Sequence, residues 1–260
     1  MSVLCVLPAR IASERLPRKP LSPIAGRTLV EWCWRAAGRV PSFDEIVVAT
    51  DSDEIAETVR SFGGSAVLTS RDHPSGTDRV AEAARRPGAR GHDVVVNFQA
   101  DEPFLDPGAV DRATRAVAEG DHEIATLAAP LTSREAWTSE SVCKVVVRED
   151  GRAMYFSRAA IPRPRGAEPE FTASAGTAYL RHIGLYVYRR AALERWTRRP
   201  PSKLESIERL EQLRALEAGE AIQVIVGPPT EPGVDVPADL ERVERALERE
   251  GPTMRGERHV

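Results

Sequence analysis

The chain has 260 residues, of which 42% are hydrophobic and 29% are charged, and its formal net charge is −3. These values are typical of a globular protein and exclude a general nucleic-acid binder, which carries a basic excess. The N-terminus lacks a basic region followed by an apolar run, and no apolar stretch approaches the roughly 20 residues of a membrane span. We therefore expect a cytoplasmic protein. Its three cysteines, Cys5, Cys33 and Cys143, are far apart and predict buried reduced thiols, not disulfides or a zinc site.

Short apolar runs alternate with amphipathic segments in the first half of the chain. Strands are predicted over residues 3–7, 45–50, 65–70 and 93–99, with helices over 51–64 and 76–86. Asp51 and Glu54 are spaced like a capping box at the start of the first of these helices. Strands that alternate with helices predict a parallel sheet covered on both faces.

The second half of the chain has more strands and fewer helices. Strands are predicted over residues 123–131, 143–150, 153–159, 181–189 and 222–226, and helices over 204–220 and 237–250. The pattern predicts an α/β, Rossmann-like fold with a mostly parallel central sheet and an antiparallel or mixed extension. We expect a single domain over residues 1–247 and a disordered tail over 248–260.

The stretch LPARIASERLPRKPL, residues 7–21, follows the first strand and contains three prolines and four cations. Each proline removes a backbone donor and fixes φ, so the stretch is predicted as a stiff loop. Loops at the carboxyl ends of strands in open α/β sheets commonly bind ligands, and Arg and Lys side chains suit phosphates. An ordinary solvated loop is the alternative. The cations are Arg10, Arg15, Arg18 and Lys19.

Two acids stand on other predicted loops. Asp101 follows the strand over residues 93–99, and Asp235 precedes the last predicted helix. Mg²⁺ is often held by one or two carboxylates plus substrate phosphates, so the two acids could form a two-point metal clamp. A turn residue at Asp101 and a helix-entry residue at Asp235 are the alternatives.

Two further segments carry polar groups. The loop HPSGTDR, residues 73–79, precedes a helix and offers backbone N–H groups to an anionic or polar ligand, although it equally suits helix capping. In the strand RHIGLYVY, alternation places His182, Gly184 and Tyr186 on one face. His182 is either a structural histidine or a contact for a sugar or carboxylate.

Eight motifs in chain order resemble the cytidylyltransferases that activate 3-deoxy-manno-octulosonate (Kdo) as its CMP derivative. They span residue 3 to about residue 247: PARIASERLPRKPL, IVVATDSDEI, HPSGTDR, VNFQADEP, YFSRAAIP, RHIGLYVYR, LESIERLEQLR and GVDVPADLERV. Any one of them is weak evidence, but all eight in family order are specific. The resemblance implies a nucleotidyltransferase fold, CTP and Mg²⁺ as partners, an acidic acceptor and a homodimer, with no nucleic-acid or membrane partner.

The resemblance also implies site residues. Arg10, Lys19 and Asp101 form the implied catalytic set, and Asp101 and Asp235 match the two metal-binding acids. The implied nucleotide-binding positions are Pro8, Ala9, Arg10, Ser13, Arg15, Lys19, Ser75, Gly76, Thr77 and Arg79. The implied acceptor-binding positions are Gln99, Arg158, His182, Tyr186 and Glu208. The implied reaction is attack of the acceptor's anomeric hydroxyl on the α-phosphorus of CTP, with release of pyrophosphate.

The sequence departs from the family pattern at two places. Ala100 replaces the glycine of the usual QGDEP motif, and an added methyl matters only where φ is positive or a ligand approaches closely. Arg163 and Arg165 follow the FSRAAIP motif where an aromatic residue is common. These cations suit a small phosphonate acceptor such as phosphonoformate, which is the alternative to Kdo. An inactive binding homologue is the third hypothesis, and the presence of Arg10, Lys19, Asp101 and Asp235 speaks against it.

Overall fold

The computed structural model describes residues 1–13, 15–172 and 176–250. The chain forms two compact units, each discontinuous in sequence. The N-terminal unit contains Ser2–His92, Asn97–Pro107 and the chain from Glu231 onward, and the central unit contains Met1, Asp93–Val96 and Gly108–Thr230. The single domain predicted over residues 1–247 stays a prediction. No helix in the described ranges is both long and apolar enough to cross a membrane.

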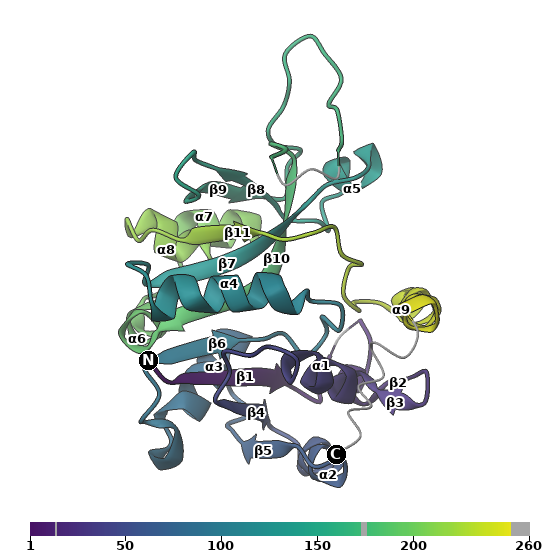
Figure 1. The fold of residues 1–260 in the computed structure, drawn as a ribbon, viewed down its shortest axis with the longest axis vertical. Helices are drawn as coiled ribbons and strands as arrows, with labels where there is room; N and C mark the ends of the chain where they lie inside the picture. Colours follow the sequence, from purple (N-terminus) through teal and green to yellow (C-terminus); the bar gives the residue numbers. More distant parts are fainter. Residues whose placement is uncertain (14, 173–175, 251–260) are drawn as a thin grey trace. The chain divides into compact units, whose positions relative to one another are not determined.

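The N-terminal unit contains a parallel sheet with the order β1-β4-β5 (Figure 1). Its strands are β1 (Val3–Ala9), β4 (Glu45–Thr50) and β5 (Ser65–Leu68). Nearly every residue of β1 is buried, as expected of a strand covered on both faces. The remaining elements are η1 (Lys19–Leu21), the ribbon of β2 (Pro23–Ile24) and β3 (Arg27–Thr28), α1 (Leu29–Ala37), α2 (Asp53–Ser61), α3 (Gly76–Arg85), η2 (Pro87–Ala89) and α9 (Pro237–Glu250).

The central unit is built on a mixed set of strands. The long strand β10 (Leu180–Arg189) is antiparallel to β7 (Ile124–Pro130), and β11 (Gln223–Val226) is parallel to β7. On the other side, β10 pairs antiparallel with β8 (Lys144–Val147), which pairs with β9 (Ala153–Ser157). Together with the parallel strands of the N-terminal unit, these pairings confirm the predicted α/β fold with parallel strands and an antiparallel extension.

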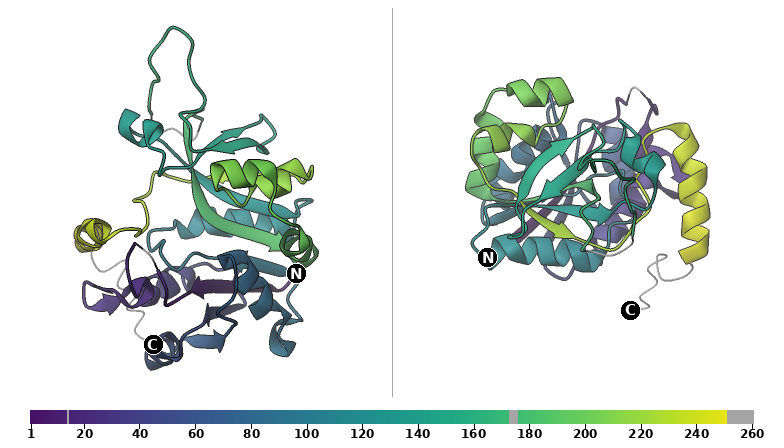
Figure 2. Two further views of the ribbon diagram at one scale, coloured as in Figure 1. Left: turned by 180° about the vertical axis from the view of Figure 1, so that it is seen from behind. Right: turned by 90° about the horizontal axis from the view of Figure 1, so that it is seen from above.

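The other elements of the central unit are β6 (Val94–Asn97, whose last residue belongs to the N-terminal unit), α4 (Pro107–Ala118), α5 (Arg134–Thr138), α6 (Arg190–Arg198), α7 (Lys203–Glu208) and α8 (Leu213–Glu217). Helices α7 and α8 lie side by side, as both views in Figure 2 show. Helices α1, α4, α5 and α6 were not predicted from the sequence.

The helix predicted over residues 204–220 is wrong in one respect, because the chain breaks it into α7 and α8. Arg209 adopts a left-handed conformation with φ +53° and ends α7. Burial changes at the same place, since Ile207 is 77% exposed whereas Leu210 and Leu213 are buried. The break ends α7 at Glu208, whose carboxylate contacts the end of β9.

Smaller differences concern element ends. Ser52, not Asp51, caps α2, because its hydroxyl accepts from the Ile55 amide. The predicted strand over 93–99 begins at Val94 and ends at Asn97. Of the tail predicted over residues 248–260, residues 248–250 belong to α9 and residues 251–260 lie outside the described residues.

All three cysteines are free thiols, as predicted. Cys5 and Cys33 are buried, and burial raises the pKa of each thiol well above its usual value. Cys143 is only partly buried, which corrects the expectation that all three are inside the core.

Candidate functional site

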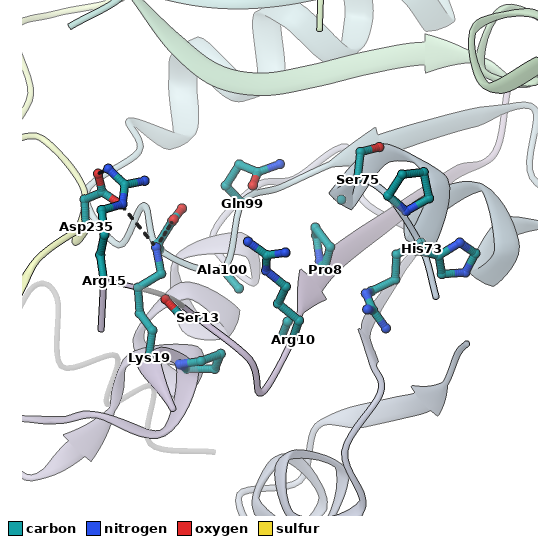
Figure 3. A pocket seen from close by; sticks show the side chains of 16 residues that line it. Pro8, Arg10, Ser13, Arg15, Lys19, His73, Ser75, Gln99, Ala100 and Asp235 are labelled. Atoms are coloured by element: carbon teal, nitrogen blue, oxygen red, sulfur yellow. Dashed lines mark hydrogen bonds and ion pairs between the residues drawn. The ribbon is translucent and has the colours of Figure 1, made fainter. Parts of the chain in front are cut away.

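A cavity of about 330 Å³ lies in the N-terminal unit. It is formed by the end of β1 and the loop after it, the loop before α3, the residues after β6 and the loop before α9 (Figure 3). The residues around it are Pro8, Ala9, Arg10, Ser13, Arg15, Lys19, Pro20, His73, Pro74, Ser75, Gly76, Arg79, Gln99, Ala100, Asp101 and Asp235. The structure thus brings together nine of the ten predicted nucleotide-binding residues, both predicted metal-binding acids and Gln99.

Strand direction explains why distant segments meet at this cavity. β1 and β4 are parallel and their carboxyl ends lie at one edge of the sheet, with Ala9 opposite Thr50. In open α/β sheets, ligands commonly bind at the loops that follow the carboxyl ends of the strands. The basic loop after β1 therefore lies where the sequence analysis expected a ligand site.

Lys19 lies between the two predicted metal-binding acids. Its Nζ donates to Asp101 Oδ2 at 2.6 Å and to the Val234 carbonyl at 3.0 Å, and it lies 3.9 Å from Asp235 Oδ1. The Lys19 side chain is 17% exposed, so this ammonium group is partly shielded from water. Arg15, which lies on the same loop as Lys19, forms an ion pair with Asp235. Two cations thus offset two carboxylates at the mouth of the cavity.

The loop before α9 is fixed against Asp101. The Val234 amide donates to the Asp101 carbonyl at 2.9 Å, and a Cβ at Gly233 would stand 2.5 Å from the same carbonyl oxygen. Only glycine permits this approach, so Gly233 is a site-forming residue that the sequence analysis missed. The helix-entry role considered for Asp235 belongs instead to Asp239, whose Oδ2 accepts from the Asp235 and Val236 amides.

Arg10 is the least compensated cation of the cavity. Its side chain is exposed and makes no ion pair with any residue that the structure describes. Figure 3 shows Arg10, Lys19 and Gln99 directed into the same hollow. Arg18, by contrast, pairs with Glu54 and does not line the cavity. The basic loop therefore divides into cations that face the cavity and one that does not.

The loop before α3 presents a helix N-terminus to the cavity. Ser75 caps α3, because its hydroxyl accepts from the Asp78 amide at 3.2 Å. Gly76 and Ser75 line the cavity, whereas Thr77 is buried behind it, with its hydroxyl 3.4 Å from Asn97 Nδ2. Thr77 therefore supports the loop from inside, and its predicted role in nucleotide binding stays a prediction.

Arg79 lines the cavity but is only 3% exposed. Its guanidinium donates to Thr69 Oγ1 at 2.6 Å and to Asp51 Oδ2 at 3.2 Å. Asp51 also accepts from the Ile11 amide, so it ties the loop after β1 to Arg79 on α3. Because a buried carboxylate already offsets its charge, Arg79 shapes the site more than it adds free positive charge.

Four other residues around the cavity were not predicted as site residues: Pro20, His73, Pro74 and Ala100. His73 pairs with Glu82 on α3. Ala100 is not among the described residues with positive φ, so its methyl group causes no backbone strain where the family has glycine. This methyl group contributes directly to the cavity wall.

The other predicted acceptor-binding residues lie in the central unit. Arg158 follows β9, Glu208 ends α7, and His182 and Tyr186 stand on β10. The rings of His182 and Tyr186 are 5.4 Å apart despite a bulge in β10 between residues 183 and 186. Glu208 is already engaged, since its two carboxylate oxygens accept from Ser157 Oγ at 2.7 Å and from the Arg158 amide at 3.0 Å.

Arg163 and Arg165, the cations that suggested a small phosphonate, line a different and more open cavity of about 850 Å³. This second cavity also lies in the central unit and includes Trp137, but none of the predicted acceptor-binding residues. The two arginines therefore do not extend the group formed by Arg158 and Glu208.

His182 is held neutral by its surroundings. Its Nε2 lies 2.9 Å from Thr126 Oγ1, and its ring packs edge-on against Phe156 at 4.9 Å. Burial, with a smaller contribution from the nearby Arg181, lowers the pKa of His182 to about 3. This histidine is thus uncharged at neutral pH and can contact a ligand only as a neutral imidazole.

His182 should make the fold sensitive to mild acid. Its pKa in the folded state is about 3, below the ordinary 6.5, so the unfolded state binds the extra proton first as pH falls. The stability due to neutral His182 is therefore lost between pH 6.5 and pH 3, and at pH 5 the loss is about 2 kcal/mol. We expect His182→Gln to reduce the fall in unfolding free energy between pH 7.5 and pH 5 by this amount in urea titrations. Equal falls in the two proteins would contradict the assignment.

Comparison with known proteins shows a family that this chain matches over most of its length. The family described as cytidylyltransferase matches residues 4–222. A protein of Syntrophobacter fumaroxidans named 3-deoxy-manno-octulosonate cytidylyltransferase is 43% identical over 94% of this chain and 96% of its own length. A protein of the same name from Nitratidesulfovibrio vulgaris is 45% identical over 91% of this chain and 92% of its own.

A solved structure is similarly close. It is the structure of a CMP:2-keto-3-deoxy-manno-octonic acid synthetase complexed with CTP, with a TM-score of 0.87 and 38% sequence identity. The match covers 96% of this chain and all of that one. The family match and these whole-length similarities show that this chain belongs to the cytidylyltransferase family, among relatives named 3-deoxy-manno-octulosonate cytidylyltransferase.

Proposed function

We propose that this protein transfers CMP from CTP to 3-deoxy-manno-octulosonate and releases pyrophosphate. The observation that carries the proposal is the cavity in which Arg10, Lys19, Asp101 and Asp235 converge beside the N-terminus of α3. A triphosphate needs several cations, and Arg10, which makes no ion pair with the described residues, supplies them together with the partly shielded Lys19. The names of relatives that are more than 40% identical support Kdo as the acceptor.

The reaction is a displacement at phosphorus. The anomeric hydroxyl oxygen of the acceptor attacks the α-phosphorus and loses its proton, and the bond from that phosphorus to the bridging oxygen of pyrophosphate breaks. Negative charge grows on the departing pyrophosphate, so preorganised cations stabilise the transition state more than the ground state. Arg10 and Lys19 have this role, while Ser13, Arg15, Ser75 and Gly76 shape the nucleotide site.

Mg²⁺ fits the donors of this site. Asp101 and Asp235 are two carboxylates that converge on one cation, the Lys19 ammonium. Mg²⁺ is often bound by one or two carboxylates and completes its shell with substrate phosphates and water. We propose that these two acids hold Mg²⁺, which would offset charge on the CTP phosphates when bound.

The acceptor can be tested directly. Pyrophosphate release should be measured with CTP and Mg²⁺ against Kdo, sialic acid and phosphonoformate, with product mass as a second readout and ATP in place of CTP as the control. We expect turnover with Kdo and none with phosphonoformate. Turnover of phosphonoformate without that of Kdo would contradict the acceptor but not the use of CTP, and no pyrophosphate with any acceptor would contradict nucleotidyl transfer itself.

The relatives do not favour the small-phosphonate alternative, and Arg163 and Arg165 line the other cavity. The inactive-homologue hypothesis is disfavoured because the four residues expected to be lost first are present and close together. The homodimer and the cytoplasmic location expected from the sequence stay predictions.

A further inference from the structure

Lys144 is a fully buried lysine on the second strand pair of the central unit. It lies on β8, has no exposed surface and forms no ion pair with the residues that the structure describes. Its Nζ donates to the carbonyl oxygens of Ser139 at 2.7 Å and Val142 at 2.6 Å, and to the carbonyl oxygen of Arg158. An ammonium group has three donors, so all three are used. Such burial is costly unless every donor is satisfied, which makes this contact set specific.

Glu208 holds the same chain segment from another direction. Its carboxylate accepts from Ser157 Oγ and the Arg158 amide, and its own carbonyl accepts from Arg158 Nε at 3.0 Å. Ser157 is only 2% exposed, so the contact is shielded from water. The left-handed Arg209 directly after Glu208 ends the helix at the point where this contact forms.

These contacts fix Arg158 at both its main chain and its side chain. Lys144 binds its carbonyl, Glu208 binds its amide, and its Nε and Nη1 donate to the carbonyls of Glu208 and Glu140. Its guanidinium donors thus go to uncharged main-chain oxygens, and Nη2 makes no hydrogen bond with the residues that the structure describes. The result is an oriented cation with one free donor edge, which suits a carboxylate.

We propose that Lys144 and Glu208 are positioning residues that hold Arg158 in one orientation for the carboxylate of the acceptor. This inference rests on the proposed function. It assigns Glu208 an effect on the acceptor through Arg158, in place of the direct contact that the sequence suggested. Neither Lys144 nor Glu208 contacts the nucleotide in this scheme, so both act on acceptor binding and not on CTP binding.

The test compares the two Michaelis constants in Lys144→Met, Glu208→Gln and Lys203→Met. Lys203→Met is the matched control, because Lys203 is exposed at the start of α7 and its side chain makes no hydrogen bond with the described residues. We expect Lys144→Met and Glu208→Gln to raise the KM for Kdo about tenfold or more while the KM for CTP stays within about twofold. The control should leave both constants unchanged. A folded variant with equal changes in both constants, or in neither, would overturn the proposal.

A second readout does not depend on turnover. Nitrogen-15 NMR of the arginine Nε–H groups should show a slowly exchanging Arg158 signal in the wild type, and faster exchange in both variants. If Lys144→Met does not fold, Ser157→Ala removes only the hydroxyl that donates to Glu208 and should give the same changes at smaller size. Wild-type protein inactive with Kdo would contradict the proposed function, whereas unchanged Arg158 exchange in the variants would contradict the positioning role alone.

Discussion

Replacing Asp101 by asparagine is expected to lower the rate of CMP transfer by roughly a hundredfold or more. The substitution keeps the size of the side chain but removes one of the two carboxylates that converge on the Lys19 ammonium. A hard divalent cation binds a carboxylate far better than an amide, so the variant should also need more Mg²⁺. Initial rates at increasing Mg²⁺ concentration, with pyrophosphate as the readout, measure both effects.

The control for this experiment is Asp72→Asn. Asp72 is exposed in the loop before α3 and does not line the cavity, so the same chemical change there should leave the rate unaltered. Thermal unfolding of both variants checks that the fold is intact. Activity of Asp101→Asn within a few-fold of wild type would show that this carboxylate does not bind the metal.

Lys19→Ala is expected to lower kcat/KM for CTP by roughly a hundredfold or more, equivalent to about 2 to 4 kcal/mol. The physical reason is that negative charge grows as pyrophosphate departs, and a partly buried ammonium group stabilises that charge better than solvent does. Both kcat and the KM for CTP should change, because Lys19 would contact the phosphates before and during the reaction. Steady-state kinetics over a range of CTP concentrations separates the two effects.

Arg18→Ala is the matched control for Lys19→Ala. Arg18 is the neighbouring residue on the same loop, but its guanidinium pairs with Glu54 and does not line the cavity. Removing it changes the net charge equally, so a general charge effect would appear in both variants. Unchanged kinetics of Lys19→Ala at subsaturating CTP would place this lysine outside the nucleotide site.

The sequence by itself determined the strands other than β2 and β3, the helices α2, α3 and α9, and the position of the basic loop. The apolar run before residue 8 and the prolines that follow predict a strand and a stiff loop, because these preferences are local. The same applies to the helix over residues 237–250, which the structure confirms as α9. Motif order also identified the family, since eight short matches in sequence need no knowledge of contacts.

Only the tertiary structure decided which charged groups lie together. Asp235 and Arg15 are 220 positions apart in sequence, yet they pair, and no local pattern contains such a contact. Arg79 has the same formal charge as Arg10, but Asp51 offsets it from a different loop. The free energy of a buried charge depends on its neighbours in space, so the sequence could name these cations but not tell which ones remain available to a ligand.

The predicted acceptor-binding residues also depend on the tertiary structure for their contacts, and more strongly than the cations of the cavity do. The sequence placed Glu208 within a continuous helix and predicted a direct contact with the acceptor. The left-handed Arg209 instead ends the helix at Glu208, and both oxygens of its carboxylate bind the end of β9. Lys144 stands in an apolar run that gives no sign of its three carbonyl contacts. Hydrogen bonds from a buried side chain to main-chain carbonyls depend on how distant strands and loops pack, and residue types alone do not encode that packing locally.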